Sequence, residues 1–209
     1  MRPFDEPARL PDTTRVTSSP RIVTLAASLR EGSFNRRLVR VASDGLEAAG
    51  ASVTRLDLRD YPLPLYDADL EKWDGLPVQA LALKDVFASH HAILFSLPEY
   101  NGSMTPLFKN TIDWASRATP GHKDGLDWAR NKPVALVSAS NGALGGLRGL
   151  FHARWTLQIC GMIVIPQQKA LSKAATAFDD AGHLVDEKER DAVYAVAKAL
   201  VDLTATMSR

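Results

Sequence analysis

Side chains suited to holding a phosphate are concentrated near the start of the chain, in the run Ser28-Leu29-Arg30-Glu31-Gly32-Ser33-Phe34-Asn35. This run follows the apolar residues 22–26 and precedes a stretch with helical spacing. The start of a helix offers free backbone N–H groups and a partial positive charge, which together attract phosphate. The side chains that could add hydrogen bonds or charge are Ser28, Arg30, Ser33 and Asn35. Taken alone, the run fits equally well a helix start capped by Ser33 or Asn35 with Arg30 in solvent.

A second polar run, Pro98-Glu99-Tyr100-Asn101-Gly102-Ser103, follows the apolar residues 92–97. Asn-Gly pairs adopt turns with positive φ, so this one can present peptide groups outward. Such groups match the donors and acceptors on the edge of a flat polar ring, and Tyr100 could cover an aromatic face. The alternative is an ordinary strand–helix turn with a surface tyrosine. For Glu99, a charge near a ring and a contact between subunits both stay open.

A third loop, residues 138–146, is rich in small residues that permit a flat ligand to approach closely. The residues expected near the ligand are Ser140, Gly142 and Gly145. A phosphate site and a ring site together indicate a mononucleotide, and FMN is the best candidate. The patterns G-x-x-x-x-G-K-[ST] and G-x-G-x-x-G are both absent, which argues against a P-loop NTPase and a conventional dinucleotide fold.

Apolar runs and helical spacings alternate along the chain, which predicts an α/β protein. The expected strands are residues 22–26, 52–56, 92–97, 133–138 and 162–166. The expected helices are residues 35–49, 77–89, a helix starting at Thr105-Pro106, 147–158 and 186–206, and residues 58–73 are expected to form a long surface loop. Five strands in this length suit a flavodoxin-like, doubly wound parallel sheet of order 2-1-3-4-5. In such a sheet the three polar loops meet at the carboxyl edge of the strands.

Composition restricts the class of protein further. The 209 residues favour one domain, expected to span 21–209 behind a flexible arm of residues 1–20 that contains four prolines. The net charge is +1, from 25 basic and 24 acidic side chains, so the chain lacks the excess of positive charge that is typical of nucleic-acid-binding proteins. The single cysteine, Cys160, excludes an intramolecular disulfide and a cysteine-pair metal site, so we expect no metal. No apolar run is long enough to span a membrane and no signal peptide is evident, so a cytoplasmic location is expected.

The chain resembles the NADPH-dependent FMN reductase family, which includes quinone, chromate and azo-dye reductases. The resemblance rests on the first two polar runs and on Lys109-Asn110-x-Ile112-Asp113-Trp114; Ala27 departs from it, since a glycine is common there. It implies FMN as cofactor, NADPH or NADH as donor, a small-molecule acceptor, and a homodimer or tetramer with flavin sites near subunit boundaries. It also implies that Ser28, Arg30, Ser33 and Asn35 hold the phosphate, that residues 98–102 meet the ring, and that residues 140–145 flank it. No catalytic side chain is expected, because the cofactor supplies the chemistry.

Two other classes of function compete with the enzyme. The first is a non-enzymatic FMN-binding electron carrier, against which the near-zero net charge speaks, since carriers steer their partners by charge. The second is a binding or regulatory module without flavin.

Overall fold

A computed structural model describes residues 19–119 and 123–207. The strands are β1 (Arg21–Ala26), β2 (Ser52–Leu56), β3 (Ala92–Ser96), β4 (Pro133–Ala139) and β5 (Ile163–Leu171). The helices are α1 (Phe34–Ala48), η1 (Leu58–Asp60, a 3-10 turn), α2 (Ala68–Asp74), α3 (Val78–Ser89), α4 (Pro106–Ala115), α5 (Leu147–Ile159) and α6 (Glu187–Met207). The arm expected over residues 1–20 lies almost wholly outside the described residues.

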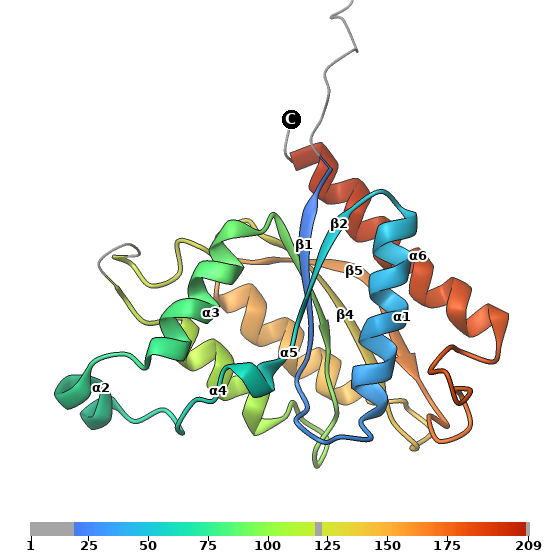
Figure 1. The fold of residues 1–209 in the computed structure, drawn as a ribbon, viewed down its shortest axis with the longest axis horizontal. Helices are drawn as coiled ribbons and strands as arrows, with labels where there is room; N and C mark the ends of the chain where they lie inside the picture. Colours follow the sequence, from blue (N-terminus) through green and yellow to red (C-terminus); the bar gives the residue numbers. More distant parts are fainter. Residues whose placement is uncertain (1–18, 120–122, 208–209) are drawn as a thin grey trace, which may run out of the picture.

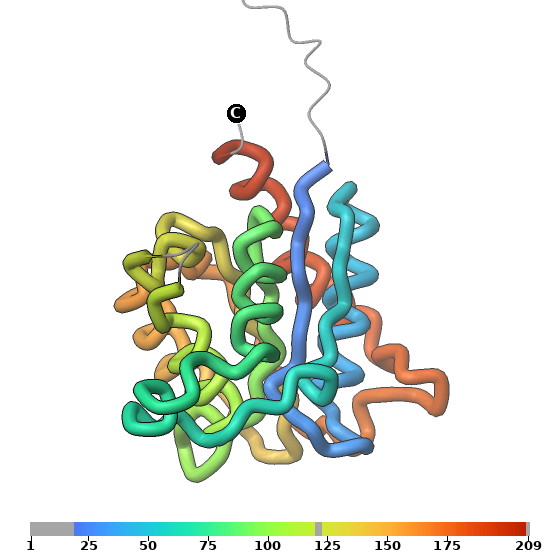
Figure 2. Tube along the Cα trace, turned by 60° about the vertical axis from the view of Figure 1, so that its left-hand side comes forward, coloured from blue at the N-terminus to red at the C-terminus, as the bar shows by residue number. Residues whose placement is uncertain are grey.

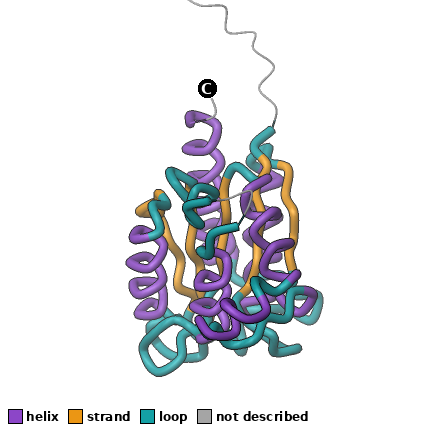
Figure 3. Tube along the Cα trace, turned by 90° about the vertical axis from the view of Figure 1, so that its left-hand side faces the viewer, coloured by secondary structure: helices purple, strands orange, loops and turns teal. Residues whose placement is uncertain are grey.

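The five strands form one parallel sheet in the order β2-β1-β3-β4-β5, as the sequence predicts. Because the strands are parallel and helices lead back between them, the loops after β1, β3 and β4 gather at one edge. This is the lower edge of the sheet in Figures 1 and 2. Helices cover both faces of the sheet, as Figure 3 shows from the side.

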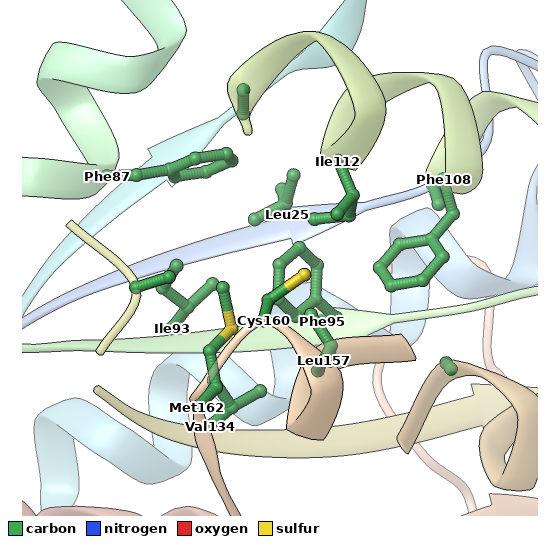
Figure 4. Close-up of a cluster of buried hydrophobic side chains, with 14 of the residues drawn as sticks. Leu25, Phe87, Ile93, Phe95, Phe108, Ile112, Val134, Leu157, Cys160 and Met162 are labelled. Atoms are coloured by element: carbon green, nitrogen blue, oxygen red, sulfur yellow. The ribbon is translucent and has the colours of Figure 1, made fainter. Parts of the chain in front are cut away.

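Each face of the sheet has its own apolar core. Helices α3, α4 and α5 pack on one face, where Phe87, Phe95 and Phe108 are almost completely buried (Figure 4). Cys160 lies in this core, and burial raises the pKa of its thiol, in agreement with a packing role. Helices α1 and α6 cover the other face through residues such as Leu38 and Leu200.

Local signals account for most element boundaries. Thr105 caps α4, its hydroxyl accepting a hydrogen bond from the Phe108 N–H at 3.2 Å, and Pro106 occupies the first helical turn. The expected loop at residues 58–73 is wrong in part, because it contains η1 and most of α2. Both elements begin at an aspartate cap, Asp57 and Asp67, a signal that proline and tyrosine content obscured.

One further expectation needs correction. β5 extends to Leu171, well beyond residue 166, because an irregularity opposite Val134–Leu136 carries the pairing past Pro166. Trp114 is completely buried within the chain and donates its indole N–H to the Pro64 carbonyl at 2.8 Å. No helix among the described residues is long and apolar enough to cross a membrane.

Candidate functional site

The loop after β1 contains two hydroxyl groups without protein partners. Ser28 and Ser33 are 7% and 2% exposed, and within the described part of the chain neither hydroxyl makes a hydrogen bond to protein. Ser33 is the N-cap residue of α1, yet its side chain caps no backbone N–H. The start of α1 therefore presents unused hydrogen-bond donors beside the positive end of the helix dipole.

Asn35 differs from Ser28, Ser33 and Arg30 because its side chain makes hydrogen bonds within the fold. Its amide Nδ2 donates to the Ala139 carbonyl at 2.8 Å, and its Oδ1 accepts from the Ala139 N–H at 3.0 Å. The Ser96 hydroxyl donates to the same Oδ1 at 2.9 Å. The side chain thus joins α1 to the ends of β3 and β4, and one N–H of its amide remains unused at the cavity.

Arg30 extends from the same loop into solvent. Its guanidinium lies 5.3 Å from the centroid of the Phe34 ring, and it makes no ion pair within the described residues. Gly32 lies beneath it, since a Cβ there would come within 3.6 Å of an Arg30 nitrogen. The cation is therefore held close to the start of α1 and remains available to an anion.

The loop after β3 forms the turn that the Asn-Gly pair predicts. Asn101 and Gly102 have φ of 51° and 79°. The Tyr100 N–H donates to the Ser103 carbonyl at 2.9 Å, and the Ser103 N–H donates back at 3.0 Å, so the loop closes as a two-residue hairpin. The Tyr100 side chain is 53% exposed at the base of this turn.

Glu99 has a structural role that the sequence left open. Its carboxylate accepts hydrogen bonds from the backbone N–H groups of Arg148 (3.1 Å) and Gly149 (3.3 Å) and from Arg148 Nε (2.8 Å). Its side chain is only 8% exposed; burial opposes its charge, but the bonds from Arg148 and Gly149 outweigh this and lower its pKa. Glu99 therefore neutralises the start of α5, and its carboxylate is not free to act on a ligand.

The loop after β4 depends on two glycines with positive φ, Gly145 at 61° and Gly146 at 93°. A Cβ on Gly145 would lie 2.7 Å from backbone atoms of Ala170 and Leu171, so only glycine fits. At Gly146 a Cβ would collide with the Ser138 hydroxyl, at 1.9 Å. These close contacts pack the loop against β4 and β5 and hold Ser140 at the edge of the sheet.

The three loops meet around one cavity of about 230 Å³. Its lining comprises Ser28, Arg30, Ser33, Phe34, Asn35, Pro98, Glu99, Tyr100, Ala139, Ser140 and Asn141. Of the residues expected from sequence, Asn101, Gly102, Gly142 and Gly145 do not line it. The two glycines of the last loop shape its backbone, and the Asn101-Gly102 turn projects beyond the cavity. Phe34, Ala139 and Asn141 were not singled out from the sequence, because only the fold brings an apolar ring and a strand end to a polar site.

An open parallel sheet of order 2-1-3-4-5 with helices on both faces defines a flavodoxin-like α/β protein, and its cavity lies at the carboxyl edge of the strands. Residues 20–176 match the family described as NADPH-dependent FMN reductase, and the chain belongs to this family. It is an NAD(P)H-dependent oxidoreductase of that kind.

Known relatives and solved structures agree with this assignment. The chain is 33% identical over 181 residues to an NAD(P)H-dependent FMN reductase of Pseudomonas aeruginosa, covering 86% of this chain and 92% of the relative. It is 34% identical over 145 residues to a quinone reductase of Escherichia coli, covering 69% and 72% of the two chains. Its fold matches FerB, a flavoenzyme NAD(P)H:(acceptor) oxidoreductase from Paracoccus denitrificans, with a TM-score of 0.75 and 28% identity, covering 90% and 98%.

Proposed function

We propose that the protein binds FMN at the three-loop cavity and passes electrons from NAD(P)H through FMN to a quinone or a similar small acceptor. The observation that carries this proposal is the pair of unpartnered hydroxyls of Ser28 and Ser33, both of which line the cavity at the start of α1. Neither hydroxyl is used by the fold, so both are available to donate to the oxygens of a ligand. A phosphate monoester has the oxygens to do so.

The residues around the cavity fit each part of FMN. The hydroxyls of Ser28 and Ser33, the Arg30 guanidinium and the first N–H groups of α1 would hold the phosphate. The peptide groups of residues 98–102 would meet the ring edge, and residues 140–145 would flank the ring. Of this last segment, Ser140 and Asn141 line the cavity.

The bound FMN would supply a ring that takes a hydride from NAD(P)H and gives electrons to the acceptor. The contribution of the protein is to hold that ring in one orientation. Asn35 fixes the start of α1 to β3 and β4, and Glu99 fixes the loop after β3 to α5. These hydrogen bonds tie the loops that would bracket the ring to neighbouring elements of the fold.

The test is to purify the protein, measure its flavin content, and follow NADPH oxidation with and without quinone. We expect bound FMN and quinone-dependent NADPH oxidation. An electron carrier would bind FMN without oxidising NADPH, and a flavin-free module would do neither. Equal affinity for riboflavin and FMN would contradict the phosphate assignment.

We also propose that the protein is a homodimer or tetramer that associates through α5. Phe151, Trp155 and Ile159 follow one another at helical spacing and are 53%, 69% and 69% exposed. Large apolar side chains in such a row indicate a contact surface. Helix α5 lies next to the loop after β3, because Ser103 Oγ is 3.2 Å from His152 Nδ1, and Tyr100 of that loop lines the cavity. A second copy seated there would adjoin the ring site.

A cytoplasmic location is proposed on one ground only. The lone cysteine is buried and has no partner for a disulfide, which is typical of proteins in a reducing compartment.

A further inference from the structure

The first two turns of α1 carry a charge pattern that is unfavourable in the free protein. Arg36, Arg37 and Arg40 lie near the start of the helix, and its first turn contains no acidic residue. Cations oppose the positive end of a helix dipole. In addition, Arg36 and Arg40 are four residues apart and Arg37 and Arg40 three apart, so their charges repel on the helix surface. A bound anion would turn this arrangement from unfavourable to favourable.

The acidic residues nearby compensate only part of this charge. Asp57 at the end of β2 pairs with Arg36 at 2.7 Å and also with Arg59 at 2.7 Å, so one carboxylate serves two guanidinium groups. Arg37 and Arg40 make no ion pair or hydrogen bond within the described residues, although Arg37 is half-buried. Two arginines are therefore left to receive an anion.

These arginines line a cavity of about 360 Å³ that is distinct from the proposed FMN cavity. Its lining comprises Glu31, Gly32, Ser33, Arg36, Arg37, Arg40, Arg59, Asp180, Ala181 and Gly182. Four arginines thus face two carboxylates. Segments far apart in the chain meet here, since the start of α1 and the loop before α6 lie at the same edge of the sheet (Figure 1). Ser33 is shared with the FMN cavity, whereas no residue of the loops after β3 and β4 takes part.

We propose that this cavity, which we call the arginine pocket, binds the 2′-phosphate of NADPH; this rests on the proposed function. A nicotinamide dinucleotide is longer than FMN, so when its nicotinamide lies against the ring its adenosine half must extend beyond it. The arginine pocket adjoins the FMN cavity across Gly32 and Ser33. The 2′-phosphate is the one group that NADPH has and NADH lacks, and Arg37 and Arg40 are suited to a phosphate monoester. The other phosphate monoester within reach is that of FMN, for which Ser28, Ser33 and Arg30 already provide a site.

The test compares the double variant Arg37→Ala, Arg40→Ala with the wild type and with the control Arg55→Ala. Arg55 also carries a charge next to α1, but it is paired with Asp44 and Glu47, each at 2.9 Å, and does not line the arginine pocket. We expect the wild type to prefer NADPH. In the double variant kcat/KM for NADPH should fall about 10- to 100-fold. For NADH, kcat/KM should stay within about twofold of the wild-type value, because the uncharged ribose of NADH carries no 2′-phosphate for the arginines to bind. The control should change neither value.

A binding measurement keeps the proposal testable if the enzyme proves inactive. In calorimetry the wild type should bind 2′,5′-ADP more tightly than 5′-AMP, and the double variant should lose this difference. An equal loss with NADPH and NADH, or a wild type that prefers NADH, would overturn the proposal. A loss confined to FMN affinity would assign the arginines to the phosphate of FMN instead. If the protein oxidises neither donor while 2′,5′-ADP still binds through Arg37 and Arg40, the proposed function fails but the pocket stands.

Discussion

Replacing Glu99 by glutamine should destabilise the fold, although this residue lies beside the proposed ligand cavity. The wild-type carboxylate accepts bonds from two backbone N–H groups and the side chain of Arg148. Glutamine keeps one acceptor oxygen but turns an NH₂ group toward donors and removes the charge at the start of α5. Hydrogen bonds to charged groups contribute about 1.5–3 kcal/mol each, and bonds at one group are not additive. We therefore expect a loss of about 1.5–3 kcal/mol in the free energy of unfolding.

Urea unfolding of the apoprotein measures this loss directly. In thermal unfolding, the Tm of the variant should be lower by about 2–4 °C for each kcal/mol lost. Glu187→Gln is the matched control, since that side chain is 81% exposed and its loss should change stability by less than about 0.5 kcal/mol. The double variant Glu99→Gln, Arg148→Ala completes a double-mutant cycle. Its loss in the free energy of unfolding should be smaller than the sum of the losses of the two single variants.

The pH dependence gives a second test of the same contact. The pKa of Glu99 is lowered in the folded protein, so its stabilising effect is full above the unfolded-state pKa, about 4.3. The effect is lost as pH falls through the lower, folded-state value. The difference between wild type and Glu99→Gln should therefore shrink as the solution is acidified below about pH 4. A glutamine variant as stable as wild type at pH 7, or a difference that persists unchanged in acid, would refute the assignment.

Three further predictions address the ligand, the subunit contact and a buried lysine. Arg30→Ala should weaken FMN binding by about 1.5–3 kcal/mol in a fluorescence titration while leaving Tm of the apoprotein unchanged; an unchanged affinity would remove Arg30 from the site. Trp155→Glu should convert the oligomer to a monomer in light scattering, and an unaltered mass would place the contact elsewhere. Burial, with a smaller effect from Arg21, lowers the pKa of Lys132 to about 8. The unfolded chain, with a lysine pKa of about 10.4, then binds more protons between these values, so stability should rise from pH 8 to 10 in the wild type and rise less in Lys132→Met.

The strands of the sheet could be predicted from sequence patterns. Each strand is either a continuous apolar run or comes directly after a stretch with helical spacing. The same patterns missed α2, which has no buried residue and so carries no apolar stripe for sequence to detect. They also ended β5 at residue 166, because a proline within a strand is read as its end, and only the pairing with β4 shows that the strand continues.

The three loops that the sequence indicates do meet around one cavity, but the hydrogen-bond partners of individual side chains could not be predicted. Asn35 and Glu99 are polar residues in a polar loop, and nothing local distinguishes a side chain that faces a ligand from one that faces the fold. Their partners, Ala139 and Arg148, lie 104 and 49 residues away in sequence. Hydrogen bonds between such distant residues become visible only in three dimensions.

Among the helices that follow strands of the sheet, α1, α4 and α5 come after the three loops of the cavity, and the contrast between their starts supports the proposed phosphate site at α1. At α4 the hydroxyl of Thr105 accepts the N–H of Phe108, and at α5 the carboxylate of Glu99 accepts the N–H groups of Arg148 and Gly149. At α1 the cap residue Ser33 makes no such bond, and the arginines that follow add further positive charge. Any of these three helix starts could have held an anion. Since α4 and α5 already have side-chain caps, α1 is the one of the three at which we expect a phosphate to bind most strongly.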